Sequence, residues 1–502
     1  MSEHVPETVT HDFPDPRTAE NVTYDPSFDE LRAFSEHLET TTEYGSPSYV
    51  SEFRSRSADR TKNSVDDEFT ESDRGLMDAA QDRARESELV CLDRMVGRHD
   101  ETAFCCRLYV PKEYGRIALA WAKLLEPAPE GREPDFETLQ LPDEADTRIR
   151  VDVDAGVTYV LGSDYTGEAK KSFLRLYMHR AKQLGGLGLH AGSKRVRVED
   201  EAGDLQTVGQ AFLGLSATGK STLTCHGCWL DDPEGAEMLQ DDVCALLPDG
   251  TVTGSEGGGL YIKTDGLDAD EQPALHHAAT REQAVLENVA VADDGAVDFD
   301  DDTLTSNGRA VVRRDDLESA SEEIDLPDVD QMFFITRNPV MPPVARLTPE
   351  QAAIAFMLGE SIETSAGDPE KAGEAIRVVG TNPFIMGSEG EEGNRFHDLV
   401  AANDVDCFVI NTGHLGAGTK DVGVTESVTI LCEVARDSID WRSDDTLGLE
   451  IPEHVPGMDI EAFYPPDHVE DYQGELAAVR AERQEYLQQF EDLREEIRDA
   501  AY

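Results

Sequence analysis

Residues 214–223 read GLSATGKSTL, a segment found where a buried strand meets a helix through a tight loop. Gly214 and Gly219, followed by Lys220 and Ser221, match G-x-x-x-x-G-K-[ST], the pattern of a loop whose backbone N–H groups surround a phosphate. We therefore expect a strand over 207–215 and a helix over 219–230. The chain should contain an α/β nucleotide-binding unit.

The whole loop is expected to bind the phosphates of a nucleotide. Lys220 is placed to neutralise the terminal phosphate, and the Ser221 hydroxyl is placed to ligate the accompanying metal ion. The residues expected to bind the nucleotide are Gly214, Leu215, Ser216, Ala217, Thr218, Gly219, Lys220, Ser221 and Thr222.

The charge of the chain is extreme. Acidic residues outnumber basic ones by 104 to 44, which gives a formal net charge of −60. Self-repulsion of this size is severe in dilute salt, but in molar salt the screening length falls to about 3 Å and most of the repulsion disappears. Only 11 of the basic residues are lysines, and the acids are spread along the whole chain. We interpret this as the composition of a protein from a halophilic archaeon.

The same charge disfavours nucleic acid and membranes as partners, because both bind clustered basic residues. No apolar run approaches the ~18 residues of a membrane-spanning helix, and the N-terminus MSEHVPETV lacks a signal-peptide pattern. Eight cysteines in 502 residues do not make a disulfide framework. We expect a cytoplasmic protein with reduced cysteines.

Two of those cysteines, Cys225 and Cys228, form a C-x-x-C pair just after the phosphate loop. A zinc site would need a second pair of ligands at comparable spacing, and the sequence has none. We expect the pair to be small core residues on the helix that follows the loop.

Hydrophobic periodicity predicts further elements on both sides of the loop. Strands are expected over 102–110, 157–163, 243–248, 332–337 and 407–413, with a hairpin over 292–299. Helices are expected over 28–39, 114–126 and 169–185, and a docked helix in the last thirty residues. The stretch 127–148, rich in Pro, Asp and Glu, is expected to be a surface loop.

The pattern predicts a mixed α/β (α+β) protein with two domains. Residues 1–26 are expected to form an irregular arm and residues 27–195 a substrate-binding domain. Residues 196–502 are expected to form the phosphate-loop, nucleotide-binding domain with a C-terminal helix.

Charged residues gather around the phosphate loop. An acid at a strand terminus beyond such a loop is the usual ligand of the nucleotide's magnesium, and Asp241 and Asp242 stand at that place. Four of the 11 lysines also fall in this part of the chain, which indicates an anionic ligand. They are Lys170, Lys171, Lys220 and Lys263.

In order along the chain the motifs read YTGEAKK (165–171), LHAGS (189–193), GLSATGKSTL, QDD (240–242) and EGGGLYIK (256–263). This series resembles the ATP-dependent phosphoenolpyruvate carboxykinase family over residues 156–430. Further matches are LENVAV (286–291), TSNGR (305–309) and VINTG (409–413). The first 150 residues match weakly, through RSRSADR (54–60).

The resemblance implies the conversion of oxaloacetate and ATP to phosphoenolpyruvate, ADP and carbon dioxide. It also implies a carboxykinase-like architecture of two domains around an active-site cleft, ATP with Mg²⁺, and Mn²⁺ as a second divalent ion. The GTP-using relatives carry a cysteine inside the phosphate loop, whereas this loop reads SATGKS. The resemblance therefore favours ATP.

The family's roles carry over to matching positions. Lys171, His190 and Asp242 would hold the divalent ion that stabilises the enolate left by decarboxylation, with Ser221 and Asp241 as further metal ligands. His190 would also lie next to the nucleotide. Arg56 and Arg309 would bind the substrate carboxylates, with Arg54 as the alternative to Arg56, and Tyr165 would lie against the substrate. Lys171, Lys220 and Arg309 would be the catalytic residues.

Some positions depart from the family pattern. The family's glutamate near the nucleotide aligns with Gln272, with Glu271 beside it, and a nucleotide-contacting arginine aligns near Asp421. An alternative is a phosphate-loop kinase acting on another small molecule or on a protein. That reading leaves Lys171, His190 and Arg309 without roles.

Overall fold

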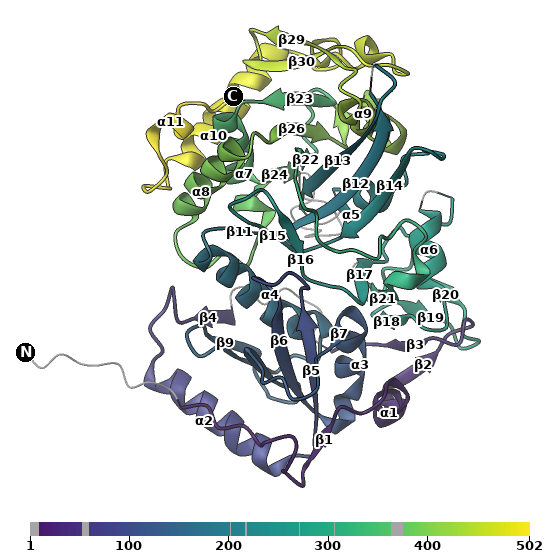
Figure 1. Cartoon of the computed structure of the whole chain (residues 1–502), viewed down its shortest axis with the longest axis vertical. Helices are drawn as coiled ribbons and strands as arrows, with labels where there is room; N and C mark the ends of the chain where they lie inside the picture. The colour runs from purple at the N-terminus through teal and green to yellow at the C-terminus, as the bar shows by residue number, and fades with distance from the viewer. Residues whose placement is uncertain are drawn as a thin grey trace, which may run out of the picture.

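The computed structural model describes residues 10–52, 60–200, 202–215, 218–270, 272–305, 307–362 and 375–502. In Figure 1 the elements up to α4 make up the lower half of the molecule, and most elements from β12 onward make up the upper half. No helix in the described ranges is long and apolar enough to cross a membrane.

The lower half is built on an eight-stranded mixed sheet in the order β1-β5-β6-β8-β10-β9-β4, with β7 beside β5. Its strands are β1 (Val22–Tyr24), β4 (Thr61–Asn63), β5 (Leu89–Val96), β6 (Phe104–Pro111), β7 (Glu126–Pro127), β8 (Phe136–Leu141), β9 (Arg148–Asp152) and β10 (Val157–Leu161). Its helices are α1 (Phe28–Phe34), α2 (Glu71–Glu86), α3 (Gly115–Leu124) and α4 (Thr166–Gln183).

Helix α3 lies at the centre of the lower core. Every one of its residues is buried, as expected for GRIALAWAKL, which is apolar on nearly all sides. It packs against α4, β5 and β6 and also touches β17 and β21, which come much later in the chain. The lower core is therefore continuous with the next layer.

A five-stranded sheet, in the order β17-β21-β18-β3-β2, joins early and late parts of the chain. Its strands are β2 (Glu39–Thr41), β3 (Pro47–Tyr49), β17 (Gly259–Lys263), β18 (Val285–Glu287) and β21 (Arg309–Arg313). The small helix α6 (Pro273–Ala279) and the hairpin of β19 (Ala290–Val291) and β20 (Val297–Asp298) accompany it. Figure 1 shows β17, β18 and β21 beside β2 and β3 at the middle of the molecule.

The upper half contains the second eight-stranded sheet, ordered β14-β12-β13-β22-β26-β23-β30-β29. Its strands are β12 (Ala191–Glu199), β13 (Leu205–Leu213), β14 (Gly235–Gln240), β22 (Gln331–Thr336), β23 (Val344–Leu347), β26 (Asp406–Asn411), β29 (Asp440–Asp444) and β30 (Leu449–His454). The central strands β13, β22 and β26 are parallel, so their carboxyl ends share one edge.

Helices cover both faces of this sheet, which explains its nearly continuous apolar strands. Residues of α5 (Lys220–Cys225) and α9 (Val424–Ala435) pack against Phe212, Phe333 and Phe408. The other face packs against α7 (Pro349–Leu358), α8 (Glu389–Ala402), α10 (Tyr472–Leu487) and α11 (Glu495–Arg498). The remaining described strands are β11 (Leu187–Leu189), β15 (Cys244–Leu246), β16 (Val252–Gly254), β24 (Glu360–Ile362), β25 (Ala375–Arg377), β27 (His414–Leu415) and β28 (Lys420–Asp421).

Most of the predicted elements are confirmed with small shifts of their ends. The strands over 102–110, 157–163, 207–215, 243–248, 332–337 and 407–413, the hairpin over 292–299 and the helices over 114–126 and 169–185 are all present. The helix predicted over 28–39 is shorter, because a 3₁₀ turn (Glu36–Leu38) and β2 follow α1. The mixed α/β class is confirmed.

Three predictions were wrong in part. The predicted surface loop 127–148 contains β8, a largely buried strand. Helix α5 ends at Cys225 rather than near residue 230, because the next residue, His226, is extended (φ −71°, ψ 129°), and Cys228 and Trp229 then adopt positive φ angles of 60° and 52°. The C-terminal stripe is divided between α10 and α11, although its residues are docked in the core as expected.

The two cysteines after the loop are both buried, but only Cys225 lies on the helix. Cys228 contacts a fully buried lysine, Lys194, whose Nζ lies 3.5 Å from the Cys228 Sγ. Lys194 also donates to the carbonyl oxygens of Leu223 (2.7 Å) and His226 (2.8 Å). This lysine therefore closes the carboxyl end of the phosphate-loop helix, where a positive charge is favourable.

Candidate active site

The phosphate-loop sequence lies between β13 and α5, at the carboxyl edge of the parallel strands. Gly219 has a φ of 97° and stands at the N-cap of α5, a conformation that favours glycine. At Gly214 a Cβ atom would approach the Thr218 Oγ1 to 2.6 Å, so the close packing of the turn requires glycine there too. Thr412 donates to the Thr218 carbonyl oxygen at 2.6 Å and ties the loop to the end of β26. Ser216 and Ala217 lie outside the described residues.

Asp242 is the centre of the charged cluster beside the loop. It follows β14, and three cationic or imidazole groups from three other segments meet its carboxylate. Lys170 Nζ on α4 lies 2.9 Å from Oδ2, while Lys220 Nζ on α5 and His190 Nε2, between β11 and β12, each lie 3.1 Å from Oδ1. We call Asp242, Lys170, Lys220 and His190 the Asp242 cluster.

Electrostatics in the Asp242 cluster follow from these contacts. Burial raises the pKa of the Asp242 carboxyl, but the charges of Lys170 and Lys220 outweigh it and hold that pKa well below its usual range. Burial, followed by the charge of Lys220, lowers the pKa of His190. His190 is therefore a neutral imidazole at neutral pH, the form that binds metal ions. Asp242 is ionised and keeps 29% of its side-chain surface exposed.

Asp241, next to this cluster, is the residue that best indicates a missing cation. Its side chain is buried, and its Oδ1 has no hydrogen-bond partner in the described structure. Burial raises the pKa of Asp241 against the opposing influence of Lys220 and of the Ser221 hydroxyl. A buried carboxylate oxygen without a partner, beside a hydroxyl and a second carboxylate, suits a divalent cation.

Lys171, predicted to be a metal ligand, has other contacts in this structure. Its Nζ lies 3.5 Å from the Glu168 Oε1 and 5.4 Å from the ring centre of Tyr165. The adjacent lysine, Lys170, is the one that contacts Asp242. Among the described residues no three His, Cys, Asp or Glu side chains are arranged to hold a metal ion. The predicted set adds Lys171 and Ser221 to three such residues, His190, Asp241 and Asp242, so its arrangement around an ion stays a prediction.

The predicted substrate residues lie together on the other side of Lys171. Arg309 Nε donates to the Tyr165 hydroxyl at 3.3 Å, and Asn307 Nδ2 donates to the same oxygen at 3.3 Å. Arg309 Nη2 also donates to Asn307 Oδ1 at 2.9 Å. Burial raises the pKa of Tyr165, but the nearby charges of Arg309 and Lys171 outweigh it and lower the pKa overall. This corner of the site therefore favours negative charge.

Several contacting residues were not assigned roles from the sequence. Glu256, at the start of the EGGG segment, lies 3.0 Å from Lys170 Nζ, and burial raises its pKa to about 7. Asn307 and Tyr261 flank Arg309. Gln272, the position that departs from the family pattern, accepts from the Thr222 hydroxyl at 3.5 Å and so lies against α5. Glu271 lies outside the described residues.

Arg56, the predicted substrate arginine, and its alternative Arg54 also lie outside the described residues. Lys263, the fourth lysine of the predicted block, pairs with Asp265 at 3.0 Å.

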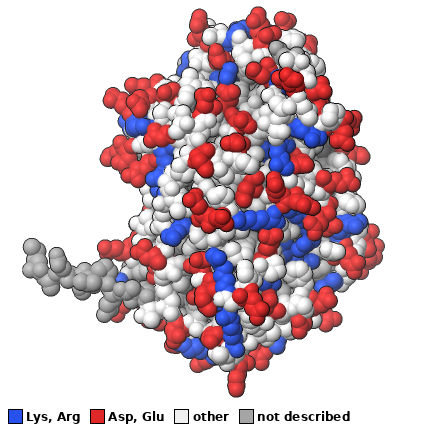
Figure 2. All heavy atoms as spheres, viewed as in Figure 1, with Lys and Arg blue, Asp and Glu red and all other residues white. Residues whose placement is uncertain are grey.

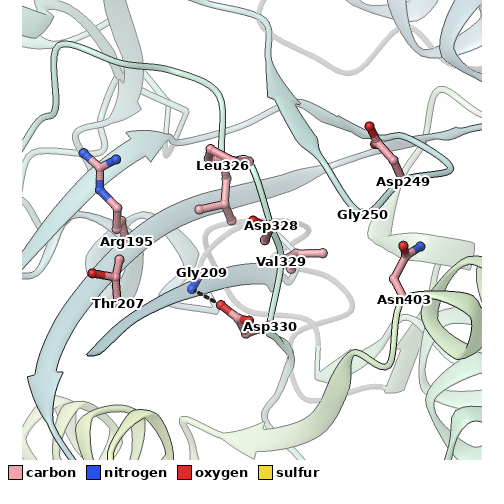
Figure 3. Close-up of a pocket in the computed structure, with 11 residues that line it drawn as sticks. Arg195, Thr207, Gly209, Asp249, Gly250, Leu326, Asp328, Val329, Asp330 and Asn403 are labelled. Carbon is pink, nitrogen blue, oxygen red and sulfur yellow. Dashed lines mark hydrogen bonds between the residues drawn. The ribbon is translucent and has the colours of Figure 1, made fainter. Parts of the chain in front are cut away.

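A groove of about 440 Å³ is found elsewhere (Figure 3). It is lined by Thr207 and Gly209 on β13 and by Asp330 just before β22, whose carboxylate accepts from the Gly209 N–H at 2.7 Å. Gly209 lies five residues before Gly214, roughly 16 Å along an extended strand. The groove is thus at the opposite edge of the sheet from the phosphate loop and is not part of the candidate site.

Comparison with known proteins shows where similar chains occur. A family model described as phosphoenolpyruvate carboxykinase matches residues 35–461. A protein of Aeropyrum pernix named phosphoenolpyruvate carboxykinase (ATP) is 37% identical over 465 residues, which are 91% of this chain and 92% of that protein. Proteins of the same name from Mesorhizobium japonicum and Bradyrhizobium diazoefficiens are 32% and 29% identical. Each of these two alignments spans 58% of the relative.

Proposed function

The chain belongs to the ATP-dependent phosphoenolpyruvate carboxykinase family, and from this premise we propose how its residues divide the work. The reaction converts oxaloacetate and ATP to phosphoenolpyruvate, ADP and carbon dioxide. It requires a phosphoryl-transfer side and a dicarboxylate side next to each other. The observation that carries the proposal is the Asp242 cluster, which brings α4, α5 and the strand ends to one carboxylate.

On the phosphoryl side, Lys220 and the N–H groups at the start of α5 offset the charge of the transferring phosphoryl group. Ser221 and Asp241 serve the Mg²⁺ of ATP, and Thr222 lies against the nucleotide. His190 and Asp242 provide a neutral imidazole and an ionised carboxylate, which are ordinary ligands of Mn²⁺. Lys171 completes this set as a neutral amine.

The divalent ion supplies Lewis-acid stabilisation of negative charge on the reacting oxygen. Around it, the protein's own residues hold the substrate. Arg309 binds a carboxylate of oxaloacetate, with Arg56 as the second arginine, and Tyr165 lies against the substrate between Arg309 and Lys171. As carbon dioxide leaves, the positive charge of Arg309 favours the enolate. The enolate oxygen then attacks the γ-phosphoryl group that Lys220 holds.

Two broader features belong to the same proposal. Acidic side chains are spread over the visible face of the molecule (Figure 2), which, with the net charge of −60, supports a halophilic archaeal origin. The protein works in the cytoplasm on small molecules, with residues 27–195 as the substrate-binding domain and 196–502 as the nucleotide-binding domain, facing each other across a cleft. Strand β12 crosses residue 196, so the two parts share a continuous strand.

The test is an assay of the purified protein in molar KCl with oxaloacetate, ATP and Mn²⁺, in which phosphoenolpyruvate is measured. We expect phosphoenolpyruvate and ADP in equal amounts, and much slower formation when GTP replaces ATP. ATP hydrolysis without phosphoenolpyruvate would contradict the proposal and would favour a kinase acting on another substrate. Product formation without a divalent ion would contradict the metal set.

A further inference from the structure

Glu287, at the end of β18, is a buried carboxylate to which the mechanism above gives no role. Only 4% of its surface is exposed. Three donors from three other elements meet it: the Tyr261 hydroxyl on β17, the Thr166 N–H at 3.0 Å, and Arg116 Nη1 on α3 at 3.2 Å. A buried carboxylate that accepts from this many donors is firmly held.

Two of these donors belong to segments that carry substrate residues. Thr166 is the first residue of α4 and follows Tyr165 directly, so its N–H contact with Glu287 holds the turn that presents Tyr165. Arg116 also pairs with Asp164 at 2.8 Å. The turn 164–166 is therefore held on both sides through one guanidinium group.

The third donor leads to Arg309. The Tyr261 ring centre lies 5.7 Å from the Arg309 guanidinium carbon and 6.2 Å from the ring centre of Tyr165. In the antiparallel pairing of β18 with β21, Glu287 is also the direct partner of Arg309. A change at Glu287 thus reaches Tyr165 and Arg309 without contact with the phosphate loop.

The chemistry of this position requires a carboxylate rather than an amide. All of the groups that meet Glu287 are donors. A glutamine would direct its own N–H₂ group toward at least one of them and would remove one of the two carboxylates that pair with Arg116, leaving Asp164. Glu287→Gln preserves the side-chain volume and should therefore displace Tyr165 and Arg309 without creating a cavity.

We propose that Glu287 is a positioning residue for oxaloacetate: it ties the start of α4, through Thr166, and the Tyr261 ring to β18, and so places Tyr165 and Arg309 for the dicarboxylate. The inference rests on the proposed function. It adds to the site a residue that touches neither substrate nor metal. The phosphate side should be independent of it.

The experiment compares Glu287→Gln with a matched control, Asp93→Asn. Asp93 lies in the lower sheet, away from the site, and is 4% exposed. It accepts from Arg107 Nε (2.7 Å) and from the Tyr24 hydroxyl (2.7 Å), the same two kinds of side-chain donor that meet Glu287. For Glu287→Gln we expect the KM for oxaloacetate to rise about tenfold, with the KM for ATP within about twofold of wild type. For Asp93→Asn both KM values should stay at the wild-type level.

Tyr261→Phe provides a milder variant if Glu287→Gln fails to fold. It removes one donor and keeps the ring under Arg309, so the KM for oxaloacetate should rise about threefold, and the double variant should show less than the product of the two effects. An unchanged KM for oxaloacetate in Tyr261→Phe, or in a folded Glu287→Gln, would overturn the inference, as would an equal rise in the control or in the KM for ATP. Wild-type protein that forms no phosphoenolpyruvate would instead overturn the proposed function, and this inference with it.

Discussion

Two carboxylates, Asp242 and Glu287, each contact three groups from distant segments of the chain. Asp242 is accessible to solvent (the open cluster), whereas Glu287 is buried (the closed cluster). Asp242 keeps 29% of its side-chain surface exposed, and two lysines and an imidazole meet it. Glu287 keeps 5% of its side-chain surface exposed, and a guanidinium, a backbone N–H and a hydroxyl meet it.

The two clusters differ in whether a ligand can replace the contacts between the protein's own side chains. The Asp242 carboxylate can turn to a metal ion and Lys220 to a phosphate, because solvent reaches the carboxylate, whereas Lys170 is only 4% exposed and also pairs with Glu256 at 3.0 Å. At Glu287 no such exchange is available, because the carboxylate is closed off from solvent, and its removal would leave buried donors without an acceptor. We therefore propose that the open cluster performs the reaction and that the closed one sets the geometry of the residues that hold the substrate.

Removal of the open cluster's loop lysine should have the largest effect. Lys220→Ala deletes a charge expected to act on the transferring phosphoryl group, and loss of ~3 kcal/mol of transition-state stabilisation lowers turnover about a hundredfold. Circular dichroism should show an unchanged fold. A variant that keeps more than about a tenth of wild-type turnover would contradict this role. Lys112→Ala, on the lower half, is the matched control.

A smaller effect is expected at the second lysine of α4. A lysine ligates a metal only as the neutral amine, so binding releases a proton and affinity rises with pH. Lys171→Arg keeps the charge but cannot ligate, and we expect its Mn²⁺ affinity by calorimetry to fall at least about tenfold. Lys182→Arg, near the far end of the same helix, should bind Mn²⁺ as wild type does. Equal affinity in Lys171→Arg would remove Lys171 from the metal set.

Glu360 is the centre of a second buried cluster, away from the residues expected to bind oxaloacetate. Its loss should therefore lower stability without changing substrate binding. Glu360 accepts from Arg483 (2.8 Å), Arg377 (3.1 Å) and Asn338 (2.7 Å). Burial raises its pKa, but Arg483 and Arg377 outweigh this and lower the pKa to about 2. Glu360→Gln should cost about 3 kcal/mol of unfolding free energy near neutral pH, with the KM for oxaloacetate unchanged.

The sign of the pH dependence follows from that depressed pKa. The unfolded chain binds a proton to Glu360 at a higher pH, near 4.5, than the folded chain does. The stabilisation is therefore complete well above pH 4.5 and is lost as the pH falls toward 2. Denaturant unfolding should show the gap between wild type and Glu360→Gln shrinking by about half from pH 6 to pH 3. A constant gap would mean that the pKa of Glu360 is the same in the folded and unfolded states.

The smallest expected effect concerns the surface. With a net charge of −60, the midpoint of thermal unfolding should fall by several degrees when KCl is lowered from 2 M to 50 mM. The buried ion pairs at Glu287 and Glu360 should be less sensitive, because salt screens exposed charges most. A midpoint independent of salt would contradict the halophilic reading of the composition.

Most of the fold could be predicted from local pattern, because strands such as 207–215 and helices such as 169–185 carry their own periodicity. Strand β8 was missed because its six residues, FETLQL, stand among Pro, Asp and Glu, whose composition is typical of loops. The end of α5 was missed because Cys228 and Trp229, which adopt positive φ angles, are residue types that seldom do so.

The site could be predicted by residue type but not by contact. The choice between Lys170 and Lys171 as the partner of Asp242 depends on how α4 is rotated against β15, which no motif encodes. The Glu287 contacts join residues 116, 166, 261 and 287, and such separations leave no local signal. Glu287 stands out in the sequence only as part of LENVAV (286–291), which matches the family pattern.

The most direct test of the contrast between the two clusters is the binding of Mn²⁺, followed by electron paramagnetic resonance of the free ion, in wild type, Asp242→Asn and Glu287→Gln. We predict that Asp242→Asn loses most of its Mn²⁺ affinity, because the substitution removes the ionised carboxylate of the open cluster. We predict that Glu287→Gln binds Mn²⁺ as wild type does. Wild-type affinity in Asp242→Asn would show that the Asp242 cluster is not the metal site, and a loss in Glu287→Gln equal to that in Asp242→Asn would show that the two clusters do not have separate roles.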